Sequence, residues 1–181
     1  DNGVEWTEFQ VAFDAIAVVV NPEADWIDDV TPATLAEIWG PDNPPQTWDQ
    51  VDSSWPDAEW ELYGPTAASG TFDFFTEEIV GETGASRDDY SKTEQDNTIV
   101  QAVSTTPNAM GYFGLAYYLQ NQDRVKAVSI NGSEPSIDNA ASGDYALARP
   151  IFIYVNNAEL ADPAVAEYVR FYLDRIDRSE E

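Results

Sequence analysis

One stretch of the chain combines small residues, hydroxyl groups and the start of a helix. It reads Gly64-Pro65-Thr66-Ala67-Ala68-Ser69-Gly70-Thr71-Phe72-Asp73. The first N–H groups of a helix have no intrahelical partner and lie at the positive end of its dipole. Ser69 and Thr71 add hydroxyl donors, and Gly70 has no Cβ to hinder close approach. This pattern is typical of an oxyanion site at a helix N-terminus.

The same stretch has a plainer explanation. Ser and Thr are the ordinary N-cap residues, so Ser69 or Thr71 can serve only to begin a helix. Taken alone, the stretch leaves both interpretations open.

A single arginine precedes position 124 and is a candidate cation for such a site. Arg87 lies in the polar segment 84–97. A guanidinium group can bind an oxyanion through two parallel hydrogen bonds. The alternative is an ion pair with Asp88 or Asp89, of a kind that is common and contributes little to stability.

The elements around this stretch have the order that an anion-binding turn requires. Residues 60–63 predict a short strand. The residues after Thr71 predict a helix whose apolar face carries Phe72, Phe75 and Ile79, and Gly81 is a suitable end. Strand, loop and helix therefore follow one another as in known anion sites.

The rest of the chain alternates between strand and helix patterns. Two long apolar strands are predicted near the ends, and shorter elements lie between them. They are a strand at 9–21, a helix from Thr31-Pro32 to Gly40, a helix from a capping box of Thr93 and Asp96 to about 107, a strand at 110–114, a short helix at 116–119, a strand at 125–130, a strand at 145–155 and a helix at 163–176. This alternation predicts the α/β class.

The charge of the chain is strongly negative. Asp and Glu number 34 against 8 Lys and Arg, which gives a formal charge of −26. Such a charge destabilises a compact state by self-repulsion, but at about 1 M salt the Debye length is only roughly 3 Å. The composition is therefore typical of a halophile's surface, with an acidic mesophilic protein as the alternative. It argues against nucleic acid or an anionic membrane as a partner.

Two absent residue types exclude several chemistries. The chain has no cysteine and no histidine. Disulfides, thiolate or imidazole metal sites and Ser-His-Asp triads are therefore excluded, and no metal or cofactor is expected. No window has the eighteen or more apolar residues of a membrane span, and the chain opens at Asp1 without a signal-peptide pattern.

An ordered series of short motifs runs over nearly the whole chain. The series is Asn21-Pro22, Val30-Thr31-Pro32 with Leu35 and Ile38-Trp39, Tyr63-Gly64-Pro65 with Ser69-Gly70-Thr71-Phe72-Asp73, Ser86-Arg87 with Asp89-Tyr90, Asp96-Asn97, Gly111-Tyr112-Phe113-Gly114 and Tyr145-Ala146-Leu147-Ala148-Arg149-Pro150. In this order it resembles the substrate-binding proteins of phosphate ABC transporters, the PstS family. Ser-Gly-Thr alone is unspecific, but the series favours the oxyanion interpretation over the simple cap.

The resemblance implies a type II periplasmic-binding-protein fold, in which two α/β lobes joined by crossing strands close over a ligand. Residues 21–144 would form the second, contiguous α/β lobe. Residues 1–20 would be a hinge strand with a remnant of the first lobe, and residues 145–181 the return hinge strand and the C-terminal helix of that lobe. The upstream part of the family, with its own share of the ligand contacts, is expected to be missing.

The resemblance also implies a function and a site. Ser69, Gly70 and Thr71 would bind inorganic phosphate outside the cell or at its surface, for delivery to the membrane permease of an ABC transporter without a chemical step. Many relatives carry an arginine four residues before the serine, where this chain has Pro65. Arg87, in a Ser-Arg element of one branch of the family, is the candidate replacement.

Three other functions remain open at this stage. The same fold could bind another oxyanion such as sulfate, molybdate or tungstate. A carbohydrate-active enzyme would use the six Trp, nine Tyr and many carboxylates, although no pair of carboxylates is singled out. The chain could also be an interaction module that has lost binding.

Overall fold

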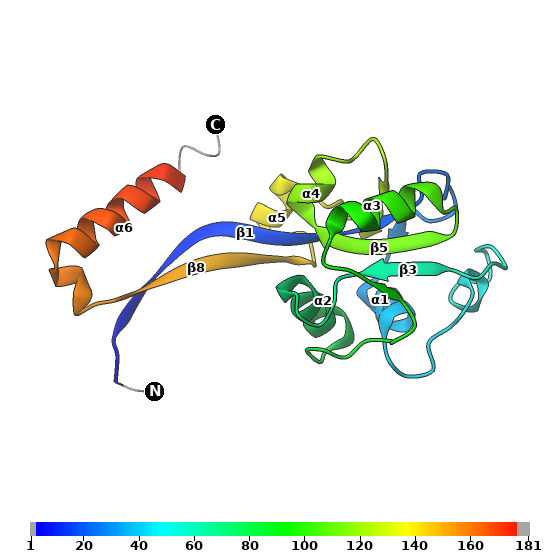
Figure 1. Cartoon of the computed structure of the whole chain (residues 1–181), viewed down its shortest axis with the longest axis horizontal. Coiled ribbons are helices and arrows are strands. Elements are labelled where there is room, and N and C mark those ends of the chain that lie inside the picture. The colour runs from blue at the N-terminus through cyan, green and yellow to red at the C-terminus, as the bar shows by residue number, and fades with distance from the viewer. Residues whose placement is uncertain (1–2, 177–181) are drawn as a thin grey trace. The chain divides into compact units, whose positions relative to one another are not determined.

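The computed structural model describes residues 3–176 and divides the chain into two compact units. The large unit comprises residues 15–148. The small unit comprises residues 1–14 and 149–181. Both are drawn in Figure 1, and both contain helix and strand. The α/β class predicted from the sequence is therefore observed.

The elements follow the predicted alternation. In chain order they are β1 (Trp6–Val20), β2 (Asp29–Val30), α1 (Pro32–Trp39), the 3₁₀ helix η1 (Trp48–Gln50), β3 (Glu61–Gly64), α2 (Gly70–Val80), β4 (Ser91–Lys92), α3 (Asp96–Thr105), β5 (Ala109–Gly114), α4 (Leu115–Leu119), β6 (Lys126–Ala127), β7 (Ser129–Ile130), α5 (Ile137–Ser142), β8 (Ala148–Asn156), the 3₁₀ helix η2 (Glu159–Ala161) and α6 (Pro163–Ile176).

One mixed sheet organises the large unit. Its strand order is β4-β3-β5-β1-β6, and β8 also pairs with β1. Strand β3 runs parallel to both β4 and β5, whereas β5 and β6 run antiparallel to β1. Strands β2 and β7 form a separate parallel pair. The ends of β3 and β5 therefore point to the same edge of the sheet, where α2 and α4 begin.

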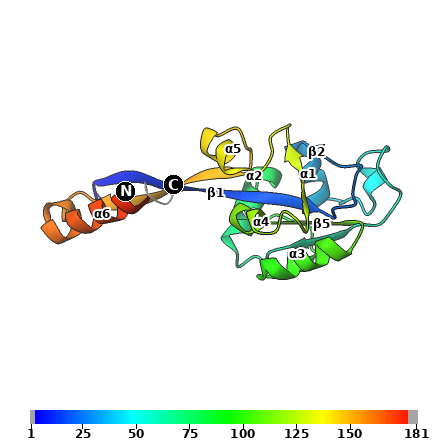
Figure 2. The same cartoon turned by 90° about the horizontal axis from the view of Figure 1, so that it is seen from above.

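Both faces of this sheet are covered by helices. Side chains alternate between the faces of a strand, and in β1 Ile16, Val18 and Val20 join the core under α1 and α2. Ala17 and Val19 instead join the core under α3. Figures 1 and 2 show α3 on one side of β3 and β5, and α1 and α2 on the other. Burial on both faces explains the continuously apolar end of β1.

The small unit contains the first part of β1, most of β8 and helix α6. Trp6 and Tyr154 pack edge to face, with ring centroids 4.8 Å apart. Arg149 Nη2 lies 3.1 Å from Asp14 Oδ2, so the aspartate that interrupts the apolar strand takes part in an ion pair. Several large apolar side chains of this unit remain exposed: Val4, Trp6, Phe13, Ile151, Tyr154, Tyr168, Phe171 and Tyr172.

Several details differ from the sequence predictions, and the short elements β2, β4, η1 and η2 were not predicted. The strand predicted at 125–130 is split, because β6 pairs with β1 while β7 pairs with β2. Helix α5 was not predicted. The capping box of Thr93 and Asp96 was wrong: α3 begins after Gln95, and Thr93 Oγ1 accepts the Gln95 N–H.

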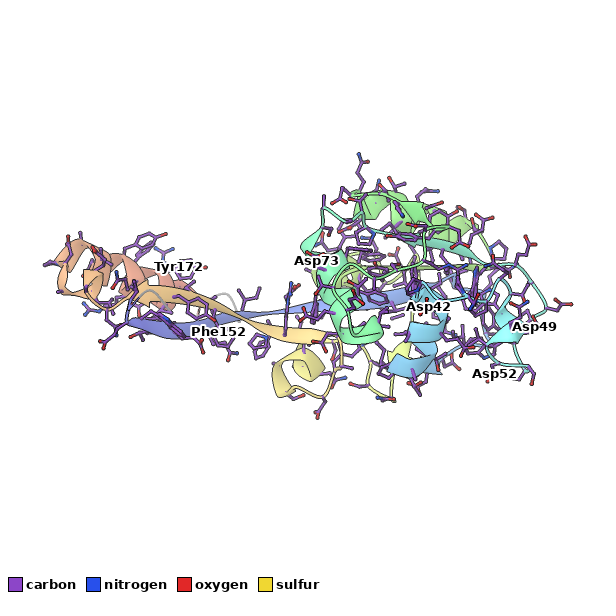
Figure 3. The ribbon with its side chains drawn as sticks, turned by 90° about the horizontal axis from the view of Figure 1, so that it is seen from below. Asp42, Asp49, Asp52, Asp73, Phe152 and Tyr172 are labelled. Atoms are coloured by element: carbon purple, nitrogen blue, oxygen red, sulfur yellow. The ribbon has the colours of Figure 1, made fainter. Side chains whose placement is uncertain are left out.

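The negative charge lies outside the core. Among residues 3–175 no Asp or Glu is buried, and Arg87 is the one charged residue that is. Figure 3 labels Asp42, Asp52 and Asp73, all three of which are exposed. Within the described residues, no helix is both long and apolar enough to cross a membrane.

Candidate functional site

The loop between β3 and α2 ends in a capped helix N-terminus. Ser69 is the N-cap residue, with φ −95° and ψ 132°, and its side chain accepts the Thr71 N–H at 3.2 Å. The Asp73 N–H donates to the Ser69 carbonyl at 3.2 Å and begins the helical ladder. Ser69 therefore does cap α2, so the cap and the oxyanion interpretations involve the same residue.

Two amide groups at this helix end have no hydrogen-bond acceptor among the described residues. Within residues 3–176, no acceptor takes the N–H of Gly70 or of Phe72. These are the first and third helical positions, where no intrahelical partner exists. They lie at the positive end of the α2 dipole, so the free donors and the dipole both favour an anion here.

Gly70 is open on the side where a Cβ would stand. A Cβ built on Gly70 would meet no heavy atom within 4 Å, and the residue does not have a positive φ. Neither packing nor backbone conformation therefore requires glycine at this exposed position. The open space leaves room for a ligand to approach the backbone at Gly70.

The loop is held rigidly on its inner side. A Cβ on Gly64 would lie 2.9 Å from the Tyr112 ring and 3.3 Å from the Tyr90 ring, so only glycine fits. Tyr90 Oη donates to the Pro65 carbonyl at 2.8 Å, and burial is the main cause that raises the pKa of Tyr90 to about 12. Pro65 is buried, so the position at which the resemblance led us to expect an arginine is part of the packing here.

A carboxylate that the sequence analysis did not single out contacts this loop. Glu94 Oε1 accepts the Thr66 N–H at 2.9 Å, and it also accepts the Thr66 hydroxyl. The two residues are 28 positions apart, and no local pattern connects them. The parallel pairing of β3 with β4 brings them together, and this pairing could not be read from the sequence.

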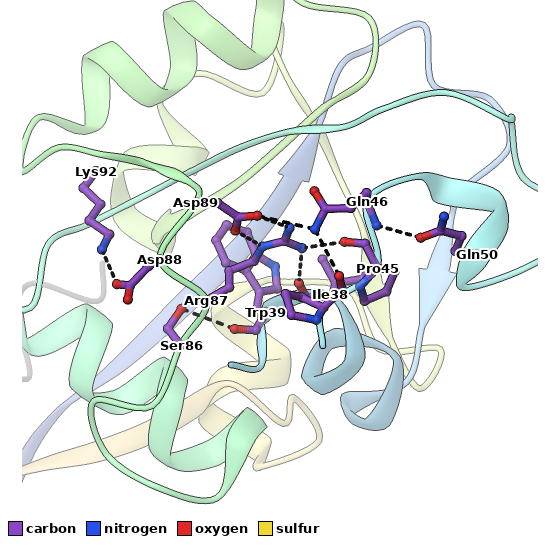
Figure 4. Close-up of polar contacts among 11 residues, drawn as sticks. Ile38, Trp39, Pro45, Gln46, Gln50, Ser86, Arg87, Asp88, Asp89 and Lys92 are labelled. Carbon is purple, nitrogen blue, oxygen red and sulfur yellow. Dashed lines mark hydrogen bonds and ion pairs between the residues drawn. The ribbon is translucent and has the colours of Figure 1, made fainter. Parts of the chain in front are cut away.

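The surroundings of Arg87 differ from those that a phosphate contact requires, because its guanidinium is buried among acceptors of the chain itself. The side chain is only 2% exposed, and Figure 4 shows its guanidinium enclosed by acceptors. Nε and Nη2 donate to the two Asp89 carboxylate oxygens at 2.5 and 2.9 Å. Nη1 donates to the carbonyls of Ile38 at 2.9 Å and Pro45 at 3.1 Å.

These contacts favour the ion-pair alternative for Arg87. Four of its five N–H groups have acceptors within the chain, and the guanidinium carbon lies 5.1 Å from the centroid of the Trp60 ring. The guanidinium joins the end of α1 and the loop at Pro45 to the segment before β4. We therefore leave Arg87 out of the phosphate contacts that we propose below.

Some of the aromatic residues that suggested a carbohydrate platform belong to the core, whereas Trp6, Tyr154, Tyr168 and Tyr172 are exposed. Trp39, Trp48 and Trp60 are buried. The Trp26 ring packs edge to face on Trp48 with centroids 4.7 Å apart, and Trp55 also contacts Trp48. The three buried Trp rings cannot stack on a sugar. Within the described part of the chain, no group of three or more acidic residues is arranged to hold a metal ion.

Comparison with known proteins identifies the family. The model of the PBP superfamily domain matches residues 2–175. The chain belongs to the PBP superfamily. Two predictions from the sequence are confirmed within this superfamily: the resemblance to the PstS family and the type II periplasmic-binding-protein fold.

Three relatives illustrate this placement. Protein SphX of Synechocystis sp. is 43% identical over 96% of this chain and 54% of its own length. The phosphate-binding protein PstS of Staphylococcus saprophyticus is 34% identical over 100% of this chain and 57% of its own. The crystal structure of a possible phosphate binding protein from Planctomyces limnophilus is 39% identical, with a TM-score of 0.88 over 99% of this chain and 67% of that one. The chain spans about half the length of the curated relatives it matches.

Proposed function

We propose that this chain is part of a protein that binds inorganic phosphate outside the cell, or at its surface, and delivers it to the membrane permease of an ABC transporter. Similar proteins whose names state phosphate binding support the ligand. Binding involves no chemical step, and the chain acts as a binding protein, not as an enzyme.

The free amides at the start of α2 carry this proposal. Phosphate accepts hydrogen bonds from the N–H groups of Gly70 and Phe72, and the hydroxyls of Ser69 and Thr71 lie beside them. Such fixed donors replace water around the anion without having to reorganise. The open space at Gly70 lets a phosphate oxygen approach the backbone.

Local donors can outweigh the global negative charge. At about 1 M salt, charges beyond roughly 3 Å from the ligand are largely screened. The nearest groups then decide binding. At this helix end the uncharged N–H and hydroxyl donors and the helix dipole favour the anion, against the carboxylates of Asp73 in the first turn and Glu94 on the loop.

The complete site needs contacts that this chain does not provide. We assign residues 21–144 to one α/β lobe, and residues 1–20 and 145–181 to hinge strands and part of a second lobe. The large unit of the structure, residues 15–148, supports a contiguous lobe of this extent. The greater length of the relatives supports further ligand contacts outside this chain. Closure of two lobes would bury the phosphate, and the closed form would dock on the permease.

Isothermal titration of the complete natural protein tests the site. We expect Ser69→Ala combined with Thr71→Ala to weaken phosphate binding by tenfold or more, because two hydroxyl donors and a cap are lost. Ser136→Ala is the matched control, since Ser136 caps α5 in the same way by accepting the Asn139 N–H at 3.1 Å. Unchanged affinity in the double variant would refute the site.

Competition in the same titration tests the ligand. Sulfate, molybdate and tungstate share the tetrahedral oxyanion geometry and are the alternative ligands. If one of these oxyanions binds more tightly than phosphate in this competition, the proposed ligand is wrong. The proposed site would still stand.

A further inference from the structure

Glu94 places a carboxylate against the loop that we propose binds an anion. Its Oε1 atom accepts both the N–H of Thr66, at 2.9 Å, and the Thr66 hydroxyl. Hydrogen bonds to a charged acceptor are stronger than bonds between neutral groups. The residue thereby fixes both the backbone and the side chain of Thr66.

Thr66 transmits this constraint to the helix cap. Its hydroxyl accepts the Ala68 N–H at 3.2 Å, and its carbonyl accepts the Ser69 N–H at 3.0 Å. Residues 66–69 therefore form a closed turn, and Ser69 at its end caps α2 through Thr71. A continuous series of hydrogen bonds leads from Glu94 to the first turn of α2.

The backbone that carries Glu94 is itself held beside the loop. Gly64 pairs with Lys92 in the parallel β3–β4 ladder, and the Thr93 N–H donates to the Gly64 carbonyl at 2.9 Å. The Gln95 N–H then donates to Thr93 Oγ1 at 3.1 Å. The backbone is thus held on both sides of Glu94, and the exposed side chain reaches Thr66 from this position.

A carboxylate at this position has an electrostatic cost. Glu94 is the second cause, after burial, that raises the pKa of Asp96 at the start of α3. A negative charge close to an anion-binding loop also opposes the ligand by Coulomb repulsion. A neutral side chain at position 94 would avoid this cost. The presence of a carboxylate there therefore points to a role for its hydrogen bonds to Thr66.

We propose that Glu94 is a positioning residue of the oxyanion site. By holding Thr66 it orders the turn 66–69 before the ligand arrives, so that Ser69 caps α2 while the amides of Gly70 and Phe72 remain free. A preordered loop loses less conformational entropy when it binds. This inference rests on the proposed function, because it assigns a role within the phosphate site.

Two variants of Glu94 separate geometry from charge. Glu94→Ala removes the acceptor, and Glu94→Gln keeps an oxygen acceptor but removes the charge. The matched control is Glu78→Ala, which removes one exposed carboxylate from α2 itself without touching the loop. Each variant is made in the complete natural protein.

Two measurements are made on each variant. Amide hydrogen exchange without phosphate reports the order of the turn, and isothermal titration with inorganic phosphate reports the affinity. In Glu94→Ala we expect exchange at Thr66 and Ser69 to accelerate, and phosphate affinity to fall, each by roughly tenfold. We expect Glu94→Gln to restore both to within about threefold of the wild type, and Glu78→Ala to change neither.

The outcomes that contradict the proposal are distinct from failure of the proposed function. Wild-type exchange or affinity in Glu94→Ala overturns the positioning role, as does a Glu94→Gln variant as weak as Glu94→Ala. If Glu94→Ala does not fold, Thr66→Val removes the hydroxyl that donates to Glu94 and accepts the Ala68 N–H, and unchanged exchange and affinity there overturn the proposal equally. If the wild type binds no phosphate, the proposed function fails, and hydrogen exchange alone then decides whether Glu94 orders the turn.

Discussion

The guanidinium of Arg87 and the carboxylate of Asp89 form a side-on pair, with Nη2 2.9 Å from Oδ2. The arginine is buried, whereas the Asp89 side chain is 52% exposed. Water therefore screens one side of the pair and reduces its contribution relative to a fully buried pair. The larger role of Arg87 is to satisfy the carbonyls of Ile38 and Pro45. These contacts make Arg87 a structural residue of the large unit.

Replacement of Arg87 should affect stability and leave binding intact. We expect Arg87→Gln to lower the free energy of unfolding by about 2–4 kcal/mol, because two carbonyls and a carboxylate lose a charged donor. Phosphate affinity should stay within about twofold of the wild type. Chemical denaturation and titration of the same samples measure both quantities.

Lys92→Gln is the control for the loss of a positive charge. Lys92 pairs with Asp88 at 2.9 Å on the surface, where such pairs contribute about 0–1 kcal/mol. A stable Arg87→Gln variant that has lost phosphate binding would reverse the assignment and return Arg87 to the site.

The pair also predicts a dependence of stability on pH. Hydrogen bonds from Arg87 are the main cause that lowers the pKa of Asp89 to about 2. The unfolded value is higher, near 3.9, so the pair contributes fully above about pH 5 and its contribution is lost as the pH falls toward about 2.

Comparison of Asp89→Asn with the wild type tests this dependence. The difference in unfolding free energy between the two proteins should shrink as the pH is lowered through that range. Asp88→Asn is the control, because its partner Lys92 is exposed. A difference that stays constant down to pH 2 would contradict the lowered pKa.

Local patterns were sufficient to predict most elements. The periodicity of α2, the Thr31-Pro32 start of α1 and the apolar run of β1 each reflect contacts within one segment or burial on both faces. The Ser69 cap and the free amides of α2 follow from residue types at fixed offsets. These features depend on neighbours in the sequence, so the sequence could reveal them.

Contacts between distant segments could not be predicted in this way. The Arg87 acceptors at Ile38 and Pro45 lie 49 and 42 positions away, and composition favoured no particular partner. The Glu94 contact with Thr66 depends on the β3–β4 register. The split of 125–130 into β6 and β7 likewise depends on two different partner strands.

Gly70→Ala should separate binding from stability. The added Cβ would meet no protein atom within 4 Å, and alanine suits a helix better than glycine. We therefore expect unchanged or slightly higher thermal stability. Phosphate affinity should fall by roughly tenfold or more, because the methyl group stands where the anion approaches the backbone.

Titration and thermal unfolding of Gly70→Ala give both readings from one protein. Its counterpart is Gly64→Ala, where a Cβ would lie 2.9 Å from the Tyr112 ring, so that variant should lose stability. A Gly70→Ala variant with wild-type affinity would show that no ligand approaches this backbone.

Salt should stabilise the fold if the acidic surface is a halophilic adaptation. The formal charge is −26, and no Asp or Glu among residues 3–175 is buried, so the carboxylates repel one another across the surface. Raising KCl from about 0.1 to 1 M shortens the Debye length from roughly 10 to 3 Å and removes most of this repulsion. The unfolding temperature should therefore rise steadily over this range. Potassium chloride and the neutral osmolyte sucrose are compared, since sucrose strengthens burial without screening charge. A rise in sucrose with none in KCl would contradict the interpretation and favour an acidic mesophilic protein.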